Sequence, residues 1–103
     1  MIIYNLTIKV RDSIVEEWLA WELEEHIPAV LATGLFDGYA FHRLLEQDES
    51  EGPTFVLQYH TSSLERYGQW VADFAPAFQR AGSEKWGDGF IAFRTIMERL
   101  VAG

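Results

Sequence analysis

The sequence contains no cysteine among its 103 residues, which excludes disulfides and thiolate-bound zinc or iron–sulfur centres. It has no apolar run long enough to cross a membrane and no basic leader followed by an apolar segment. Eight Lys and Arg residues face sixteen Asp and Glu residues, so the formal net charge is −8. Nucleic acid and anionic membrane surfaces both need a basic patch, so we expect neither as a partner. The expected location is cytoplasmic, with an acidic, well-solvated surface.

Motifs that specify a chemistry are also missing. There is no glycine-rich phosphate loop and no Gly-x-Ser-x-Gly nucleophile turn. His42 and His60 lack the short spacing of a zinc helix motif, and no third ligand is placed by spacing. We therefore expect no metal and no cofactor, and the sequence specifies no reaction.

Aromatic residues are plentiful, with four Trp, four Tyr and seven Phe in a chain that is 49% hydrophobic. The length favours one domain over residues 1–103. A domain this short has a small core, so part of this apolar surplus is expected at an interface or around a ligand.

Alternating apolar residues predict strands over residues 1–10, 39–46, 54–61 and 90–100. The first of them places Ile2, Tyr4, Leu6, Ile8 and Val10 on one face. The acidic run 47–52, followed by Pro53, predicts the loop of a hairpin between the second and third strands.

A helix is predicted from Ser13, which has capping-box spacing to Glu16, to a stop at Gly34. Pro28 cannot donate the N–H that a straight helix needs, so we expect a kink or a break at residues 26–28. The expected buried stripe recurs at every fourth residue: Val15, Leu19, Leu23, Ile27 and Leu31.

A second helix is predicted from Ser62, with Glu65 at capping-box spacing, to a stop at Gly82. Pro76 predicts a kink within it. Its expected buried face is Leu64, Tyr67, Val71, Phe74 and Phe78.

The order strand–helix–strand–strand–helix–strand predicts a ferredoxin-like α+β sandwich, with both helices on one face of a four-stranded antiparallel sheet. The other face would be bare in a monomer, and it is predicted to carry few charges. Its expected residues are either Ile3, Asn5, Thr7, Val56, Gln58 and His60 or else their alternates on the same strands, and in both cases large apolar groups lie on both faces. Because a water-facing sheet would carry more charge, we expect two copies to pack their sheets together as a homodimer of the dimeric α/β-barrel type.

Four segments carry a resemblance to a known family. They are the opening MIIYN, residues 17–34 with their EWxxW and HIPxVLATG patterns, RLLE at 43–46, and FRTxME at 93–98. Over essentially the whole chain the sequence resembles domain of unknown function 4286, a group of short bacterial proteins. That family carries no assigned activity. Its fold is similar to that of the dimeric α/β-barrel superfamily, which includes cofactor-independent monooxygenases, haem-degrading enzymes and isomerases.

The superfamily comparison implies no specific activity, because a fold alone does not carry function. A haem-degrading member needs an Asn, a Trp and a haem-ligating His brought together. Asn5 and Trp70 are present, but the second predicted helix has no histidine. Haem degradation is therefore not expected.

His26 is the first candidate for chemistry, with Glu22 one helical turn before it. A carboxylate beside an imidazole favours the protonated ring, so the pair could exchange a proton near neutral pH. Trp18 and Trp21 could wall a pocket beside it. In the alternative interpretation, His26 bonds a carbonyl freed by Pro28, and the tryptophans simply pack.

A second candidate group lies on strands, where Arg94 could hold a carboxylate in bidentate fashion. Its members, predicted to converge on one sheet face, are Asn5, Gln58, His60, Arg94 and Glu98. The alternative is that Arg94 pairs with Glu98 or with an acid across the interface. Tyr4, Tyr59 and His42 are further candidate wall residues.

Two functional hypotheses follow. The first is a homodimeric domain that binds a small molecule, or is structural, with no assignable reaction. The second is an enzyme like the cofactor-independent monooxygenases or isomerases, with His26 as acid/base, Glu22 beside it and Arg94 as anion anchor. The second requires that His26 and Arg94 line one cavity of about 300 Å³ or more. A protein-interaction subunit is a third, weaker idea.

Overall fold

Four strands rich in β-branched and aromatic residues form the sheet of the computed structural model, which describes all 103 residues. They are β1 (Ile2–Val10), β2 (Gly38–Arg43), β3 (Thr54–Thr61) and β4 (Phe90–Glu98). All neighbours pair antiparallel in the order β2-β3-β1-β4. This order confirms the predicted ferredoxin-like α+β sandwich, although the strands predicted at 39–46 and 90–100 extend too far.

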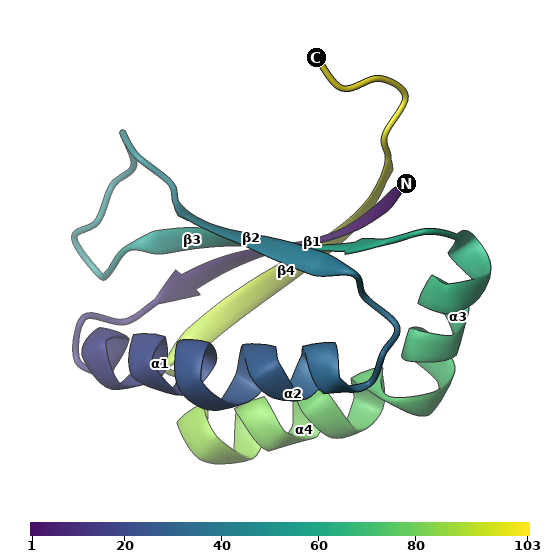
Figure 1. Cartoon of the computed structure of the whole chain (residues 1–103). Coiled ribbons are helices and arrows are strands. Elements are labelled where there is room, and N and C mark those ends of the chain that lie inside the picture. Colours follow the sequence, from purple (N-terminus) through teal and green to yellow (C-terminus); the bar gives the residue numbers. More distant parts are fainter.

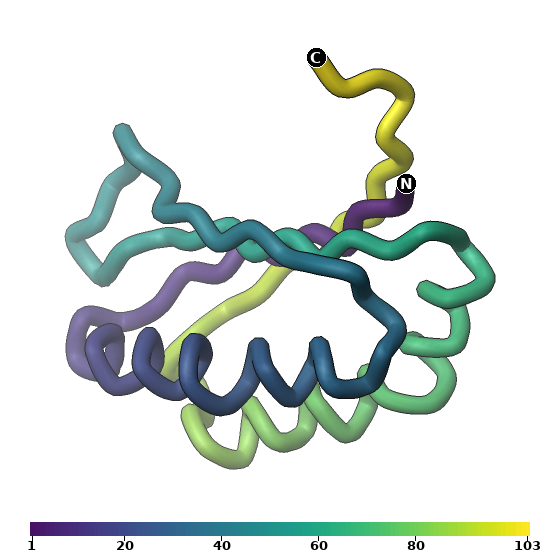
Figure 2. Tube along the Cα trace, viewed as in Figure 1, coloured from purple at the N-terminus to yellow at the C-terminus, as the bar shows by residue number.

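The helices are α1 (Val15–Trp21), the π-helix η1 (Glu22–His26), α2 (Ile27–Ala32), α3 (Leu64–Asp73) and α4 (Ala75–Trp86). All of them cover the same face of the sheet (Figure 1). The C-terminal segment and the β2–β3 connection extend to the helix-free side (Figure 2). None of the helices combines the length and the apolar composition that crossing a membrane requires.

The kink or break predicted at residues 26–28 is not a break: the helix continues from Val15 to Ala32, and its irregularity is a π-helical turn that ends immediately before Ile27. Pro28 removes a helical hydrogen bond and its ring crowds the carbonyl four residues earlier, and a widened turn relieves both problems. The extra residue in this turn shifts the buried face, so Glu22 and Ile27, five positions apart, both point inward. The predicted stripe is therefore wrong at Leu23, whose surface is 52% exposed.

Both predicted helix starts are wrong. The first helix has Ile14 at its N-cap with no side-chain cap, because residues 11–14 form a turn in which the Ile14 N–H donates to the Arg11 carbonyl. The second helix is capped by Ser63, whose Oγ accepts the Arg66 N–H at 3.2 Å, rather than by Ser62. The extended backbone of Ser63 is what an N-cap requires.

Replacing Ser63 with alanine should lower the free energy of unfolding by about 1 kcal/mol, because the Arg66 N–H loses its acceptor. Ser62→Ala is the matched control and should change little, since the Ser62 side chain makes no capping bond. Urea unfolding of both variants measures the difference. Equal losses at the two positions would contradict the assignment of Ser63 as the cap.

The second predicted helix is broken near Pro76, as expected, where Phe74 leaves helical geometry with φ −125°. Gly82 was predicted to end it, but α4 continues to Trp86 and ends at Gly87, whose φ is 57°. Gly82 is instead buried, and a Cβ there would lie 3.6 Å from the Phe90 ring.

The predicted buried face of the second helix is also partly wrong. Leu64 and Val71 are exposed, and Trp70 is buried in their place. The change of direction at Phe74 separates α3 from α4, so one continuous stripe cannot describe both.

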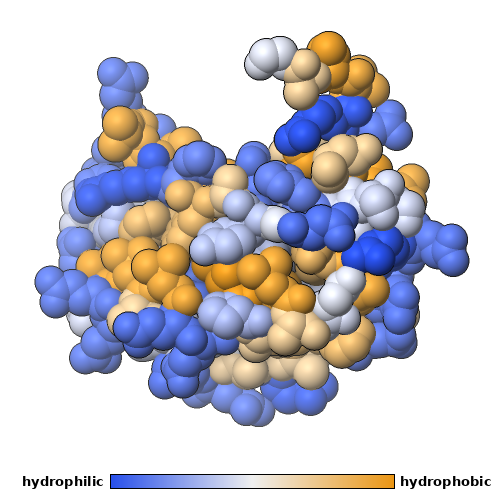
Figure 3. Space-filling model, viewed as in Figure 1, coloured by the Kyte–Doolittle hydropathy of each residue, from blue (hydrophilic) through white to orange (hydrophobic).

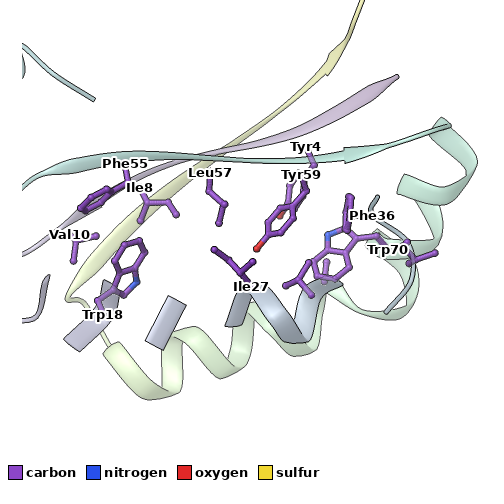
Figure 4. Packing of buried hydrophobic residues seen from close by; sticks show 13 residues of the cluster. Tyr4, Ile8, Val10, Trp18, Ile27, Phe36, Phe55, Leu57, Tyr59 and Trp70 are labelled. Carbon is purple, nitrogen blue, oxygen red and sulfur yellow. The ribbon is translucent and has the colours of Figure 1, made fainter. Parts of the chain in front are cut away.

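The core lies between the sheet and the helices and is dominated by aromatic rings (Figure 4). Figure 3 shows hydrophobic residues in a band between the two layers, with hydrophilic residues over much of the outer surface. The thirteen buried residues of the cluster are Tyr4, Ile8, Val10, Trp18, Ile27, Val30, Leu35, Phe36, Phe55, Leu57, Tyr59, Trp70 and Ala75.

Candidate functional site

A cavity of about 340 Å³ lies between the sheet and the helix layer. Side chains from β1, β3 and β4 form one wall, and side chains from all the helices form the other. Twelve of its eighteen lining residues are hydrophobic, which suits a ligand with an apolar body. The aromatic lining consists of Tyr4, Trp18, Trp21, Tyr59, Trp70, Phe78 and Phe90.

The helix layer contributes a paired carboxylate and imidazole to the cavity wall. Glu22 Oε1 lies 2.5 Å from His26 Nδ1, and both residues line the cavity. Glu22 is only 2% exposed, a rare position for a carboxylate. Glu22 lies one turn after the buried Trp18 on the same face, and the π-helical turn of η1 brings Ile27, five residues later, to that face as well.

Aromatic rings hold His26 in place from two sides. The Trp21 ring stacks on the imidazole at 4.6 Å between centroids, and Phe78 meets it edge-on at 5.7 Å. With Nδ1 occupied by Glu22 and the ring clamped, the imidazole has a defined orientation. Its hydrogen bond goes to a carboxylate, so the alternative in which His26 bonds a carbonyl freed by Pro28 is not what the structure contains.

Arg94 brings a positive charge to the same cavity from the edge strand β4. It pairs in register with Leu6, which places it on the helix side of the sheet. No ion pair joins Arg94 to an acidic residue, so it does not pair with Glu98 within the protomer. A guanidinium beside an apolar cavity without a carboxylate partner can hold an anionic ligand.

Two buried donors in the cavity wall have no well-aligned protein acceptor. The Tyr59 hydroxyl is shielded from solvent and makes no hydrogen bond, and the Trp70 indole N–H, equally shielded, makes no well-aligned one, although the Tyr4 hydroxyl lies near it. Figure 4 shows the Tyr59 hydroxyl pointing from the sheet toward the helix layer. Burial raises the pKa of Tyr59 well above its ordinary value, and the Glu22 carboxylate adds to that rise. The Tyr59 hydroxyl is therefore a donor at any physiological pH.

Tyr4 lies between these groups on β1. Burial raises the pKa of Tyr4, while the charge of Arg94 and the polar groups of Trp70 and Arg94 oppose that rise more weakly. The Tyr4 hydroxyl therefore lies close to both Arg94 and Trp70, between the charged part of the cavity and its buried part.

The structure brings together some of the predicted site residues and separates others. Five of them line the one cavity: Trp18, Trp21, Glu22, His26 and Arg94. Tyr4 and Tyr59, named as candidate wall residues, line it as well. The prediction that Arg94 and Glu98 share a sheet face with Asn5 is wrong. Asn5 pairs with Thr95, and successive residues of a strand face opposite sides of the sheet, so Arg94 and Glu98 lie on the face opposite to Asn5.

Asn5, Gln58 and His60 lie instead on the open face, by which we mean the sheet face without helices. Gln58 donates to Asn5 Oδ1 at 3.1 Å, and Asn5 donates to Thr95 Oγ1 at 3.1 Å, forming a polar line across three strands. Glu98 shares the side of Arg94 but does not line the cavity. Sequence reasoning missed Trp70, Gln79 and Ser83 as lining residues. Gln79 lies inside the predicted helix, and Ser83 follows it by one turn, just beyond the stop predicted at Gly82.

Two further expectations can be compared with the geometry. His42 lies on the exposed edge strand β2, away from the cavity, and no three His, Asp or Glu side chains cluster as metal ligands would. Asn5 and Trp70 lie on opposite sides of the sheet, so the pair that haem-degrading enzymes bring together is not assembled within this protomer.

The sequence pattern of the family described as Domain of unknown function (DUF4286) matches residues 1–100. The chain belongs to this DUF4286 family. The comparison with curated proteins found no match. For the DUF4286 chain, no reaction can therefore be taken from a relative.

Solved structures share the fold of this DUF4286 protein at low identity. A dimeric ferredoxin-like protein from an uncultured marine organism superposes with a TM-score of 0.70 and 12% identity, covering 100% of this chain and 98% of that one. An ethyl tert-butyl ether D (EthD) family protein from Bacillus halodurans gives 0.67 and 12%, covering 97% and 100%. A point mutant of MhuD, crystallised with two manganese protoporphyrin IX molecules per active site, gives 0.68 and 19%, covering 100% and 98%. Identities this low show the shared fold alone.

Proposed function

We propose that this DUF4286 protein is a homodimer whose cavity binds a small, mostly apolar anion. The observation that carries the binding proposal is the position of Arg94, a guanidinium without an acidic partner that borders a cavity of about 340 Å³. A permanently charged group beside an aromatic wall attracts a ligand with a charged end and an apolar body.

A screen of aromatic and aliphatic carboxylates by thermal shift tests this proposal. A ligand at one hundred times its dissociation constant should add about 2.7 kcal/mol of stability. Replacing Arg94 with glutamine should weaken the best carboxylate about tenfold or more, because a charge-assisted hydrogen bond contributes about 1.5–3 kcal/mol. The unliganded stability should hardly change, since Arg94 forms no ion pair within the protein.

Arg80→Gln is the matched control, because Arg80 is an exposed arginine of α4 that does not line the cavity. Equal affinity in the Arg94 and Arg80 variants would remove Arg94 as the anion anchor. Failure of every carboxylate to stabilise the protein would argue against the binding proposal as a whole.

The Glu22–His26 pair favours a second candidate function, acid–base catalysis of the kind used by cofactor-independent monooxygenases or isomerases. An oriented imidazole in a cavity that also holds Arg94 could remove a C–H proton from a bound acid while the guanidinium holds its carboxylate. Ligands from the screen, incubated in deuterated water and followed by NMR, test this candidate. Deuterium uptake that His26→Gln abolishes would support it.

The open face supports the homodimer. Lys9 is the single Lys, Arg, Asp or Glu residue on this surface. The connection between β2 and β3 and the C-terminal segment both extend on that side and carry exposed leucines, Leu45 and Leu100 (Figure 2). The residues of the open face are Ile3, Asn5, Thr7, Lys9, Gly38, Ala40, His42, Thr54, Val56, Gln58, His60, Ile91, Phe93, Thr95 and Met97.

A further inference from the structure

The buried donors of the cavity indicate a second chemical group on the ligand, in addition to the anionic group that Arg94 would bind. The Tyr59 hydroxyl and the Trp70 indole N–H belong to residues that line the same cavity; the first has no acceptor, and the second has only the poorly aligned Tyr4 hydroxyl nearby. Leaving a buried donor unpaired has a free-energy cost, so native proteins rarely do so without a reason. Two such groups in one cavity point to an oxygen atom that arrives with a ligand.

The kind of group they require follows from their chemistry. An indole N–H can only donate, and burial keeps the Tyr59 hydroxyl protonated. The buried carboxylate on the helix side, Glu22, is already bonded to His26. A carbonyl or ether oxygen would satisfy the donors, whereas a second carboxylate would meet the negative charge of Glu22 beside Tyr59.

The positions of Tyr59 and Arg94 in the sheet set the distance between the end of the cavity that holds the unpaired donors and the charged end. Tyr59 is on β3 and Arg94 is on β4, with β1 between them. Tyr59 pairs with Tyr4 and Arg94 with Leu6, so two strand spacings combine with an offset of two residues along β1 to give about 12 Å between the two backbone positions. A single aromatic ring with substituents at opposite ends has a similar length, and the aromatic wall between the two ends would contact its faces.

We propose that the cavity takes an aromatic carboxylate with a carbonyl or similar acceptor at its far end, the carboxylate on Arg94 and the acceptor on Tyr59 and Trp70. This inference rests on the proposed binding function and specifies its ligand class. In this orientation the uncharged acceptor of the ligand lies inside the cavity and the ligand carboxylate lies at the edge strand β4. The ligand carboxylate is then kept away from the carboxylate of Glu22.

The test compares para-acetylbenzoate with para-isopropylbenzoate, which have similar shapes and differ in the acceptor oxygen. The acetyl compound should bind about tenfold more tightly, as measured by NMR titration. The Trp70 indole proton should move downfield with the acetyl compound only. Tyr59→Phe should bring the two affinities close together and keep the fold, because the hydroxyl it removes has no protein partner.

The outcomes separate the inference from the proposed function. If both benzoates bind equally, or if Tyr59→Phe leaves the preference intact, the acceptor inference is overturned while the carboxylate-binding function stands. If neither benzoate binds, or Arg94→Gln binds both as tightly as the wild type, the proposed function fails and takes the inference with it. Tighter acetylbenzoate binding that depends on Tyr59, with the Trp70 signal shifted, supports the inference.

Discussion

Replacing His26 with leucine is expected to lower the free energy of unfolding by about 3 kcal/mol at neutral pH. The Glu22 side chain is nearly inaccessible to solvent, and His26 is its only hydrogen-bond partner. Removing the imidazole leaves a buried carboxylate without a partner, which is among the most destabilising changes a core can undergo. The expected loss is at the lower end of the usual range because Glu22 borders a cavity. Chemical denaturation measures it.

The double variant Glu22→Leu with His26→Leu should recover this stability or exceed that of the wild type, since apolar residues of similar size often replace a buried ion pair without loss. A double variant no more stable than His26→Leu alone would contradict the idea that the cost comes from an unpaired Glu22.

A stable double variant would also explain why the pair is present. If leucines at positions 22 and 26 hold the fold at least as well, the stability of the fold does not require the Glu22–His26 pair. Proteins commonly accept lower stability at sites where function needs it. Ligand binding and proton exchange should then be measured in the double variant. Loss of ligand binding or of proton exchange in a well-folded double variant would assign the Glu22–His26 pair to function rather than to stability.

The order of the elements could be predicted from the sequence because strand and helix periodicities differ strongly. The alternation from Ile2 to Val10 and the spacing from Tyr67 to Phe78 each fit one kind of structure. Pro28 and Pro76 correctly indicated where both helices are irregular, since proline affects the helix through its own backbone.

The buried faces were harder to predict, because they depend on local geometry that the proline only implies. The π-helical turn inserts one residue, so the buried positions are Trp18, Glu22 and Ile27, and Leu23 faces outward. A pattern based on hydrophobic residues cannot anticipate a buried glutamate. The partner of Glu22 could be predicted all the same, because the spacing from Glu22 to His26 brings the two side chains together on either kind of helix.

The placement of Arg94 illustrates a second limit. A strand has two faces, and shifting its pairing by one residue exchanges them. The sequence predicts a strand over residues 90–100 but contains nothing that fixes its register against β1, so Arg94 was grouped with Asn5. The orphan donors Tyr59 and Trp70 were beyond prediction for a related reason, since a missing hydrogen bond is a property of packing.

If the proposed homodimer forms through the open face, replacing Phe93 with aspartate is expected to convert it to a monomer, raising the dissociation constant by about a thousandfold or more. Phe93 lies on the open face and is 62% exposed in the protomer. In a two-fold dimer each substitution occurs twice, and each would bury a carboxylate against a surface with one cation, Lys9. Sedimentation velocity across micromolar concentrations measures the change.

The control for this prediction is Leu64→Asp. Leu64 has the same exposed fraction, 62%, but it lies at the start of α3, on the helix layer. An aspartate there is favourable for the helix and should leave the oligomeric state unchanged. The comparison isolates the face on which the charge is placed, because exposure and introduced charge are matched. A wild-type protein that sediments as a monomer, or a Phe93→Asp variant that remains dimeric, would mean that the open face is not where two copies meet.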